Sequence, residues 1–341
     1  IMQKPTLPFP IAQKIKKELR LHDDVRNDDY FWLNEKESPS VLDYLNAENT
    51  FRESEMKETE ELQKQLFEEI KGRIKEDDQS VPYRKNGYWY YVRYETGMEH
   101  AIYCRKKGSL DAEEEILLDA NEEAKNFSYY QIAGMSISND NKLLAYGEDT
   151  VSRRIYTIRF KNLETGEMLD DRIENTTGGA AWAEDNKTVF YTTKDETLRP
   201  AYIWRHKLGT TPQEDMEVYH EKDETFVCSV YKSKSRRFLM IGCSSTVSNE
   251  YHYLDSHDPT GSFKVLQSRV RELEYSVADF EDHWYILTNK DKATNFKLMK
   301  SPLDMPSQEN WVDVIHHREN VYLENVEIFK DFLVTEEREN G

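Results

Sequence analysis

Six short polar turns, each followed by a strand-like run of aromatic or aliphatic residues, recur along the chain and restrict its possible folds more than any other feature. The turns are Asn86-Gly87, Asn141-Lys142, Asn186-Lys187, Arg236-Arg237, Asp282-His283 and Lys330-Asp331. The second residues of successive turns are 45 to 55 positions apart. A period of roughly 40–50 residues with about four strands in each unit is typical of β-propeller blades. The repeat therefore predicts a mainly β chain built as a propeller, and the alternative is a pair of ordinary β-sandwiches with accidental regularity.

The second repeat unit shows the expected strands most clearly. They fall around residues 131–136, 143–147, 154–160 and 168–173, in short runs rich in β-branched and aromatic residues. We expect the propeller to occupy residues 79–341, with roughly five to six blades. The sixth unit reaches Gly341 just after its second strand, so we expect an incomplete propeller with an open side.

Residues 1–78 have a different texture and predict an α-helical N-terminal extension. No Pro or Gly occurs from Val41 until Gly72, and Ser40 is a plausible N-cap for a helix that runs to about Lys75. Four apolar residues lie four positions apart and define one face, which we call the helix stripe: Leu62, Leu66, Ile70 and Ile74. An amphipathic helix of this kind must place its apolar stripe against another surface.

The acidic composition excludes several functions. A net charge of −19 repels nucleic-acid backbones and favours encounters with basic ligands, although surface acids also serve solubility. The three cysteines, Cys104, Cys228 and Cys243, lack the spacing of a disulfide framework or a metal site. We expect no metal or cofactor. The sequence has no apolar run long enough for a membrane span and no signal peptide, so we expect no membrane partner and a cytoplasmic location, with the periplasm as the alternative.

Motifs that could carry catalysis all favour a structural interpretation. The strings at Gly134-Met135-Ser136 and Gly242-Cys243-Ser244 lack the second glycine of a hydrolase nucleophile turn and lie in strand-like sequence. His316 and His317 are adjacent in the sequence. Neighbouring strand residues point to opposite faces, so the two imidazole rings are not expected to share one ligand. The acidic runs at 113–115 and 214–215 lie in expected connecting segments, where solvated charge is the rule. We therefore expect no catalytic residue in this chain.

Several motifs in one order resemble the prolyl oligopeptidase family, and within it oligopeptidase B, also called protease II. The N-terminal motifs are residues 22–33 (HDDVRNDDYFWL) and 41–49 (VLDYLNAEN). The motifs similar to oligopeptidase B are residues 77–84, 93–97, 102–105, 115–119 and 143–147.

The resemblance implies a seven-bladed propeller that caps a C-terminal α/β-hydrolase domain. Members of the family cut short peptides, and oligopeptidase B-like members cut after Lys or Arg. The family's Ser, Asp and His belong to the hydrolase domain, so the resemblance implies that this chain alone is inactive and that its parent protein is the serine peptidase. The alternative function is a stand-alone propeller that binds other proteins.

Two surfaces are candidates for contact with that hydrolase domain. The first is the segment from Asp149 to Arg154, where Asp149, Arg153 and Arg154 place both signs of charge in a loop that either docks a domain or simply decorates the surface. The second is the helix stripe, which the resemblance places over the hydrolase domain. Without that domain we expect the chain to self-associate through the stripe, through an unpaired blade edge after Phe332-Leu333-Val334, or through both.

Overall fold

The structure is a computed structural model that describes residues 7–341. The chain forms two compact units, Ile1–Glu76 and Asp77–Gly341. Strands dominate the larger unit and helices the smaller, which confirms the prediction of a mainly β chain with a helical N-terminal extension. Within the described residues, no helix has both the length and the apolar character that crossing a bilayer requires.

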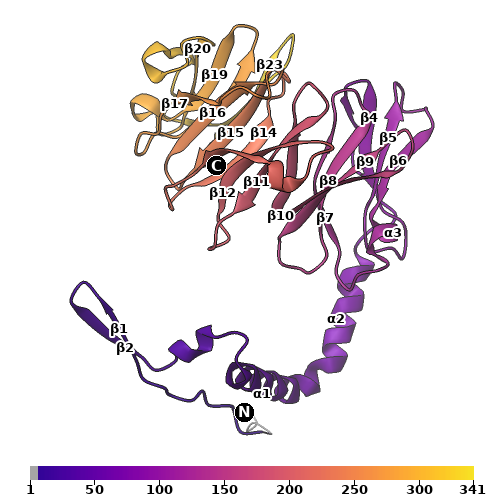
Figure 1. Ribbon diagram of the computed structural model, residues 1–341, viewed down its shortest axis with the longest axis vertical. Helices are drawn as coiled ribbons and strands as arrows, with labels where there is room; N and C mark the ends of the chain where they lie inside the picture. The colour runs from indigo at the N-terminus through magenta and orange to yellow at the C-terminus, as the bar shows by residue number, and fades with distance from the viewer. Residues whose placement is uncertain (1–6) are drawn as a thin grey trace. The chain divides into compact units, whose positions relative to one another are not determined.

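The first unit contains a β-hairpin followed by helices (Figure 1). Its elements are β1 (Lys17–Leu21), β2 (Asp24–Asp28), η1 (Phe31–Asn34), α1 (Pro39–Met56), η2 (Lys57–Thr59) and α2 (Glu60–Gly72). His22 and Asp23 form the hairpin turn with φ values of 50° and 63°. Paired left-handed residues match the right-handed twist of the flanking strands, which explains a tight turn here.

The helical segment formed by α1 and α2 begins at Pro39 and ends at Gly72, whereas the sequence predicted a helix from Val41 to about Lys75. Ser38 occupies the N-cap position and Pro39 the first turn, so the prediction that Ser40 caps the helix is wrong. Proline suits the first turn because its missing N–H would have no helical partner there. The single-turn η2 separates α1 from α2, and α2 ends at Gly72, so Ile74 lies beyond the helix.

The second unit is a series of antiparallel sheets that correspond to propeller blades. Blade 1 contains β3 (Tyr83–Lys85), β4 (Tyr88–Arg93), β5 (Ile102–Lys107) and β6 (Glu114–Asp119), and α3 (Ala120–Ala124) follows it. Blades 2 and 3 form one seven-stranded sheet of β7 (Gln131–Ile137), β8 (Leu143–Asp149), β9 (Tyr156–Asn162), β10 (Met168–Trp182), β11 (Thr188–Lys194), β12 (Pro200–Lys207) and β13 (Met216–His220), with η3 (Pro212–Glu214) before β13.

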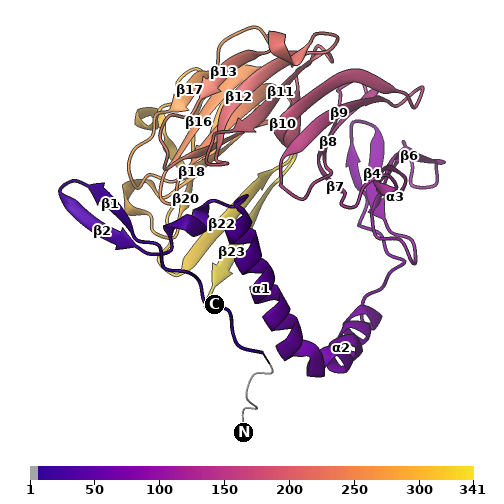
Figure 2. The same cartoon turned by 60° about the horizontal axis from the view of Figure 1, so that its bottom comes forward.

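The remaining sheets follow in chain order. Blade 4 contains β14 (Val227–Lys232), β15 (Phe238–Ser244), β16 (Asn249–Asp255) and β17 (Lys264–Gln267). Blade 5 contains β18 (Tyr275–Phe280), β19 (His283–Thr288), β20 (Lys297–Pro302) and β21 (Val312–Ile315), with η4 (Lys290–Lys292) and η5 (Gln308–Asn310) between its strands. Blade 6 contains β22 (Val321–Ile328) and β23 (Leu333–Glu339). Figure 2 shows the sheets of this unit side by side in an arc that does not close into a ring within the described residues.

The predicted turns connect the first and second strands of the blades, as the repeat requires. Asn86, Asn141, Asn186 and Arg236 have φ values of 48°, 63°, 55° and 71° in four of these turns. Asn tolerates the left-handed region better than most residues, because its short side chain bonds to the local backbone. The four strands predicted for the second repeat unit of the sequence correspond to β7, β8, β9 and the first half of β10.

Strand β10 is long because it serves two blades. Its first half pairs with β9 and its second half with β11, and the register shifts near Thr176. Gly178, at φ 96° in β10, lies so close to Gly147 of β8 that a Cβ on Gly147 would be 2.5 Å from the Gly178 Cα. The sequence repeat did not indicate this continuous strand.

The hydrophobic core lies between consecutive blades. Tyr90 and Leu118 of blade 1 pack against Leu144 and Tyr146 of blade 2. Similar clusters join blades 3 and 4 around Phe190 and blades 4 and 5 around Trp284. Each blade therefore depends on its neighbours for burial, as expected for repeat architectures.

Candidate functional site

The turns between the first and second strands of the six blades lie together, and we call this group the turn rim. Hydrogen bonds join the turns of consecutive blades from blade 1 to blade 5. Asn86 Nδ2 of blade 1 donates to the Asn139 carbonyl of blade 2 at 2.7 Å, and Asn139 Nδ2 donates to the Ala183 carbonyl of blade 3 at 2.9 Å. Arg237 of blade 4 donates to the Glu281 carbonyl of blade 5. The residues that form the repeat in the sequence therefore also connect the blades in space.

The turn of blade 4 makes additional bonds to blades that are not its neighbours. Lys232 Nζ donates to Asn139 Oδ1 of blade 2 at 2.9 Å, and Arg236 Nη1 donates to Asn86 Oδ1 of blade 1 at 3.2 Å. Lys234 forms an ion pair with Glu327 of blade 6. These bonds connect blade 4 to blades 1, 2 and 6 at this end of the blades.

Charges in the turn rim are largely compensated. Glu184 of blade 3 accepts from Lys232 Nζ at 2.6 Å and from Arg236 Nη2 at 3.2 Å. Burial alone would raise the pKa of Glu184, but the hydrogen bonds from Lys232 and Arg236 outweigh it and lower the pKa below the ordinary value. The hydrogen-bonded groups of the turn rim therefore connect the blades at this end.

The Asp149–Arg154 loop lies at the opposite end of blade 2, between β8 and β9. Asp149 is buried and accepts hydrogen bonds from the backbone N–H groups of Val151, Ser152 and Arg154 at 2.8 to 3.0 Å. Its carboxylate therefore holds the loop in shape and is not a surface charge. Arg153 and Arg154 are exposed, and their contact with another domain stays a prediction.

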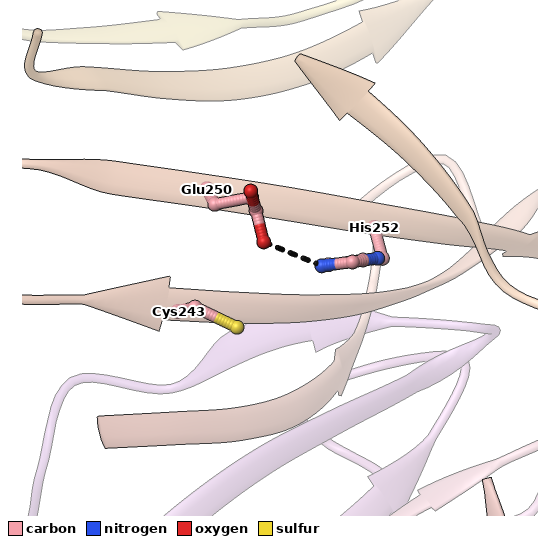
Figure 3. Close-up of side chains that lie close together, drawn as sticks. All are labelled: Cys243, Glu250 and His252. Atoms are coloured by element: carbon pink, nitrogen blue, oxygen red, sulfur yellow. Dashed lines mark hydrogen bonds and ion pairs between the residues drawn. The ribbon is translucent and has the colours of Figure 1, made fainter. Parts of the chain in front are cut away.

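Three potential metal ligands come together in blade 4. Figure 3 shows Cys243, Glu250 and His252 turned toward one another, with His252 Nε2 at 3.0 Å from Glu250 Oε1. Cys243 and Glu250 are cross-strand partners of β15 and β16, which explains why sequence spacing did not reveal the group.

The surroundings of this group do not suit a cation. Arg269 Nη2 lies 3.0 Å from Glu250 Oε1, and the Arg269 backbone N–H donates to Glu250 Oε2 at 2.8 Å. Burial raises the pKa of the Cys243 thiol above its ordinary value, which disfavours the thiolate that metals bind. The group is better explained as part of a buried ion network in which Arg269 also binds Glu221 at 2.7 Å.

A second buried network contains acidic residues that were expected to be solvated charges in connecting segments. His206 is fully buried, with Nδ1 at 2.6 Å from Asp215 and Nε2 at 2.9 Å from Asp171. The interpretation of Asp215 as a solvated charge is therefore wrong. Burial would lower the pKa of His206, but Asp215 and Asp171 raise it overall. Glu114 and Glu115 likewise lie in strand β6, where they pair with Arg93 and Arg105.

The remaining catalytic candidates lie where structural residues are expected. Gly134 and Ser136 belong to β7, and Gly242 and Ser244 belong to β15, as predicted. The two adjacent histidines lie just after β21 rather than within it, and they have different partners: His316 contacts Asp313, and His317 Nε2 accepts the Asn295 N–H at 3.2 Å.

Comparison with known proteins identifies the fold and its family. Residues 10–341 match the family described as "Prolyl oligopeptidase, N-terminal beta-propeller domain". The chain belongs to the prolyl oligopeptidase family. The structure of oligopeptidase B from Leishmania major aligns with a TM-score of 0.89 and 29% identity, covering 97% of this chain and 49% of that one.

Two further proteins are similar to this chain in sequence over almost its whole length. Dipeptidyl aminopeptidase BI of Pseudoxanthomonas mexicana is 40% identical over 98% of this chain and 48% of its own length. Protease 2 of Moraxella lacunata is 35% identical over 98% of this chain and 49% of its own length. The chain therefore spans about half the length of these prolyl oligopeptidase relatives, and the family resemblance inferred from the motifs is confirmed.

The helix stripe of this prolyl oligopeptidase chain is exposed. Leu62, Leu66, Ile70 and Ile74 are 54%, 45%, 61% and 64% exposed. These values leave room for another surface to cover the stripe, and its contact with a hydrolase domain stays a prediction.

Changing Leu66 and Ile70 to Gln together should reduce self-association of the 341-residue chain. Burial of such side chains contributes about 1.5–3 kcal/mol each, so their loss should weaken association by more than about tenfold. Light scattering over a concentration series would measure the change. The matched control carries Lys64→Gln and Glu68→Gln on the same helix and should behave like the wild type. A strictly monomeric wild type with α2 protected from hydrogen exchange would contradict the prediction.

Proposed function

We propose that this chain is the access-restricting propeller of a serine oligopeptidase that cleaves short peptides after Lys or Arg. The observation that carries the proposal is the likeness to oligopeptidase B over almost the whole chain, at a TM-score of 0.89. In this proposal the parent protein performs acyl transfer in an α/β-hydrolase domain through a Ser-His-Asp triad, and the present chain contributes no catalytic residue.

The turn rim supports the access-restricting role. Its bonds between blades 1, 2 and 4 narrow one end of the channel, so a folded protein is excluded while a flexible peptide reaches the active site by another route. The helix stripe and the Arg153–Arg154 pair are the surfaces that we assign to the hydrolase domain. The net charge of −19 favours encounters with basic peptides.

The test uses the full-length protein and two N-blocked amide substrates that differ only in arginine or citrulline. We expect a preference for arginine of at least about 100-fold in kcat/KM, because citrulline removes the positive charge and keeps the shape. A second comparison places the same arginine site in a short peptide and in a folded protein, and only the short peptide should be cut. Equal rates for arginine and citrulline would contradict the specificity, and absence of any peptidase activity would favour a stand-alone interaction propeller.

A second candidate activity is removal of dipeptides from free N-termini. It is favoured by the 40% identity to a relative named dipeptidyl aminopeptidase. The N-blocked substrate distinguishes the two activities, because an aminopeptidase needs the free amino group. Cleavage of the unblocked dipeptidyl amide alone would support this second candidate.

We further propose a cytoplasmic location, with the periplasm as the alternative, and a reaction that needs no cofactor. The three cysteines are free and buried, and reduced thiols are usual in the cytoplasm. Unchanged turnover after treatment with a chelator is the expected result for a reaction without a metal.

A further inference from the structure

The imidazole ring of His206 in β12 lies between carboxylates from two blades. The ring is fully buried, with Nε2 at 2.9 Å from Asp171 Oδ1 and Nδ1 at 2.6 Å from Asp215 Oδ1. Asp171 belongs to the first half of β10, which pairs with β9 in blade 2, whereas His206 and Asp215 belong to blade 3. The Nε2 contact therefore joins two blades, and the Nδ1 contact lies within one blade.

Both carboxylates act as acceptors, and this determines the protonation of the ring. Asp215 Oδ2 accepts a hydrogen bond from the Tyr191 hydroxyl at 2.7 Å, and Asp171 Oδ1 accepts one from the Gly209 N–H at 2.7 Å. A neutral imidazole has one N–H donor and one acceptor nitrogen, whereas an imidazolium has two N–H donors. Because each ring nitrogen faces a carboxylate oxygen, the two contacts need two donors, which only the positively charged ring supplies.

The groups around the ring favour this positive charge. Asp171 reaches it from β10, Asp215 from the segment before β13, and Tyr191 of β11 acts through Asp215. The Phe160 ring of β9 stacks on the imidazole with centroids 6.2 Å apart and adds no charge. Burial alone would lower the pKa of His206, but the hydrogen bonds to the two carboxylates outweigh it and raise the pKa above its ordinary value of 6.5.

We propose that His206 is a protonation switch at the joint between blades 2 and 3. The imidazolium donates to both carboxylates and links the two blades. When the ring loses a proton, the remaining N–H stays on Nδ1, because that contact is the shorter one and lies within blade 3. The lone pair of Nε2 then faces Asp171 Oδ1, and two acceptors repel each other, so the link to blade 2 is lost. This switch involves no catalysis and goes beyond the proposed function.

The proposal fixes the direction of a pH dependence. A histidine whose pKa is raised by folding contributes its full stability below the pKa of the unfolded chain, and this contribution is lost as the pH rises through the folded-state pKa. We therefore expect the joint between blades 2 and 3 to be intact below pH 6.5 and to weaken as the pH rises above this value.

The experiment is amide hydrogen exchange of the full-length protein, read by peptide mass spectrometry over a pH series and corrected for the intrinsic exchange rates. Protection of β12 and of the first half of β10 should fall by at least about tenfold between about pH 6.5 and about pH 9.5, the loss expected for one charge-assisted hydrogen bond. Strands β4 and β5 of blade 1, which contain no histidine, are the internal control and should keep their protection.

Asp171→Asn tests the contact between the blades. An amide can turn its N–H toward the neutral Nε2 and carries no charge that repels it, so most of the loss of protection at high pH should disappear. Asp170→Asn is the matched control, since it removes the same charge from the adjacent exposed position and should keep the pH dependence of the wild type. Protection of β12 and β10 that is constant over the pH series in the wild type, or an equal pH dependence in the wild type and Asp171→Asn, would overturn the proposal.

Discussion

Replacing Arg269 with Gln should lower the free energy of unfolding by about 3 kcal/mol, because it leaves two buried carboxylates without their cation. Arg269 Nη2 lies 2.7 Å from Glu221 Oε2 and 3.0 Å from Glu250 Oε1, and the guanidinium carbon Cζ lies 3.9 Å from the centroid of the Phe226 ring. Glu221 follows the last strand of blade 3, whereas Glu250 lies in blade 4. We choose the lower part of the range known for buried pairs because the Arg269 side chain is 27% exposed.

Urea unfolding of the two proteins would measure this difference. Arg271→Gln is the matched control, since Arg271 lies two residues away and is exposed. It should change the stability by less than about 0.5 kcal/mol. If Arg269→Gln were no more destabilising than this control, the network would contribute nothing to the joint between blades 3 and 4.

The same network predicts a pH dependence. Burial alone would raise the pKa of Glu250, but the hydrogen bonds from His252 and Arg269 lower it to about 2, from an ordinary value of 4.5. A carboxylate with a lowered pKa stabilises the fold fully above pH 4.5, and this contribution is lost as the pH falls toward 2. Urea midpoints between pH 5 and pH 3 should therefore fall less steeply in Arg269→Gln than in the wild type, and equal slopes would contradict this assignment.

Replacing Gly147 with Ala should destabilise the protein by about 3 kcal/mol, the upper part of the range for overpacked interiors. A Cβ on Gly147 would lie 2.5 Å from the Gly178 Cα and 2.6 Å from the Gly178 carbonyl oxygen. Both atoms belong to the backbone of β10, which also pairs with β9 and β11, so the strand cannot move without disturbing blades 2 and 3 together.

Gly179→Ala is the matched control, because nothing lies within 4 Å of a Cβ at that position. Thermal or urea unfolding of both variants would test the difference. Similar stabilities for Gly147→Ala and Gly179→Ala would contradict this prediction. They would show that β8 and β10 can move apart at Gly147 and Gly178 without loss of stability.

The amino-acid sequence by itself determined the propeller architecture, because blade structure is encoded locally. Each turn needs a polar pair that tolerates a tight bend, and each following strand needs a run of β-branched or aromatic residues, so the period is visible without tertiary contacts. The same holds for the helical extension, whose spacing of apolar residues revealed the helix stripe. Its ends were predicted less accurately, since the helix begins at Pro39 with Ser38 as its N-cap, two residues before the predicted cap Ser40.

Only the tertiary structure decided which charged residues are buried and what they contact. Arg269 and Glu221 are 48 positions apart, and Asp149 resembles any loop acid until its three backbone donors are seen. The turn rim follows the same principle: the repeat located Asn86 and Arg236, but the bond between them joins residues 150 positions apart. The physical reason is that turn and strand preferences act within a few residues, whereas the burial and pairing of a charge depend on how neighbouring blades pack.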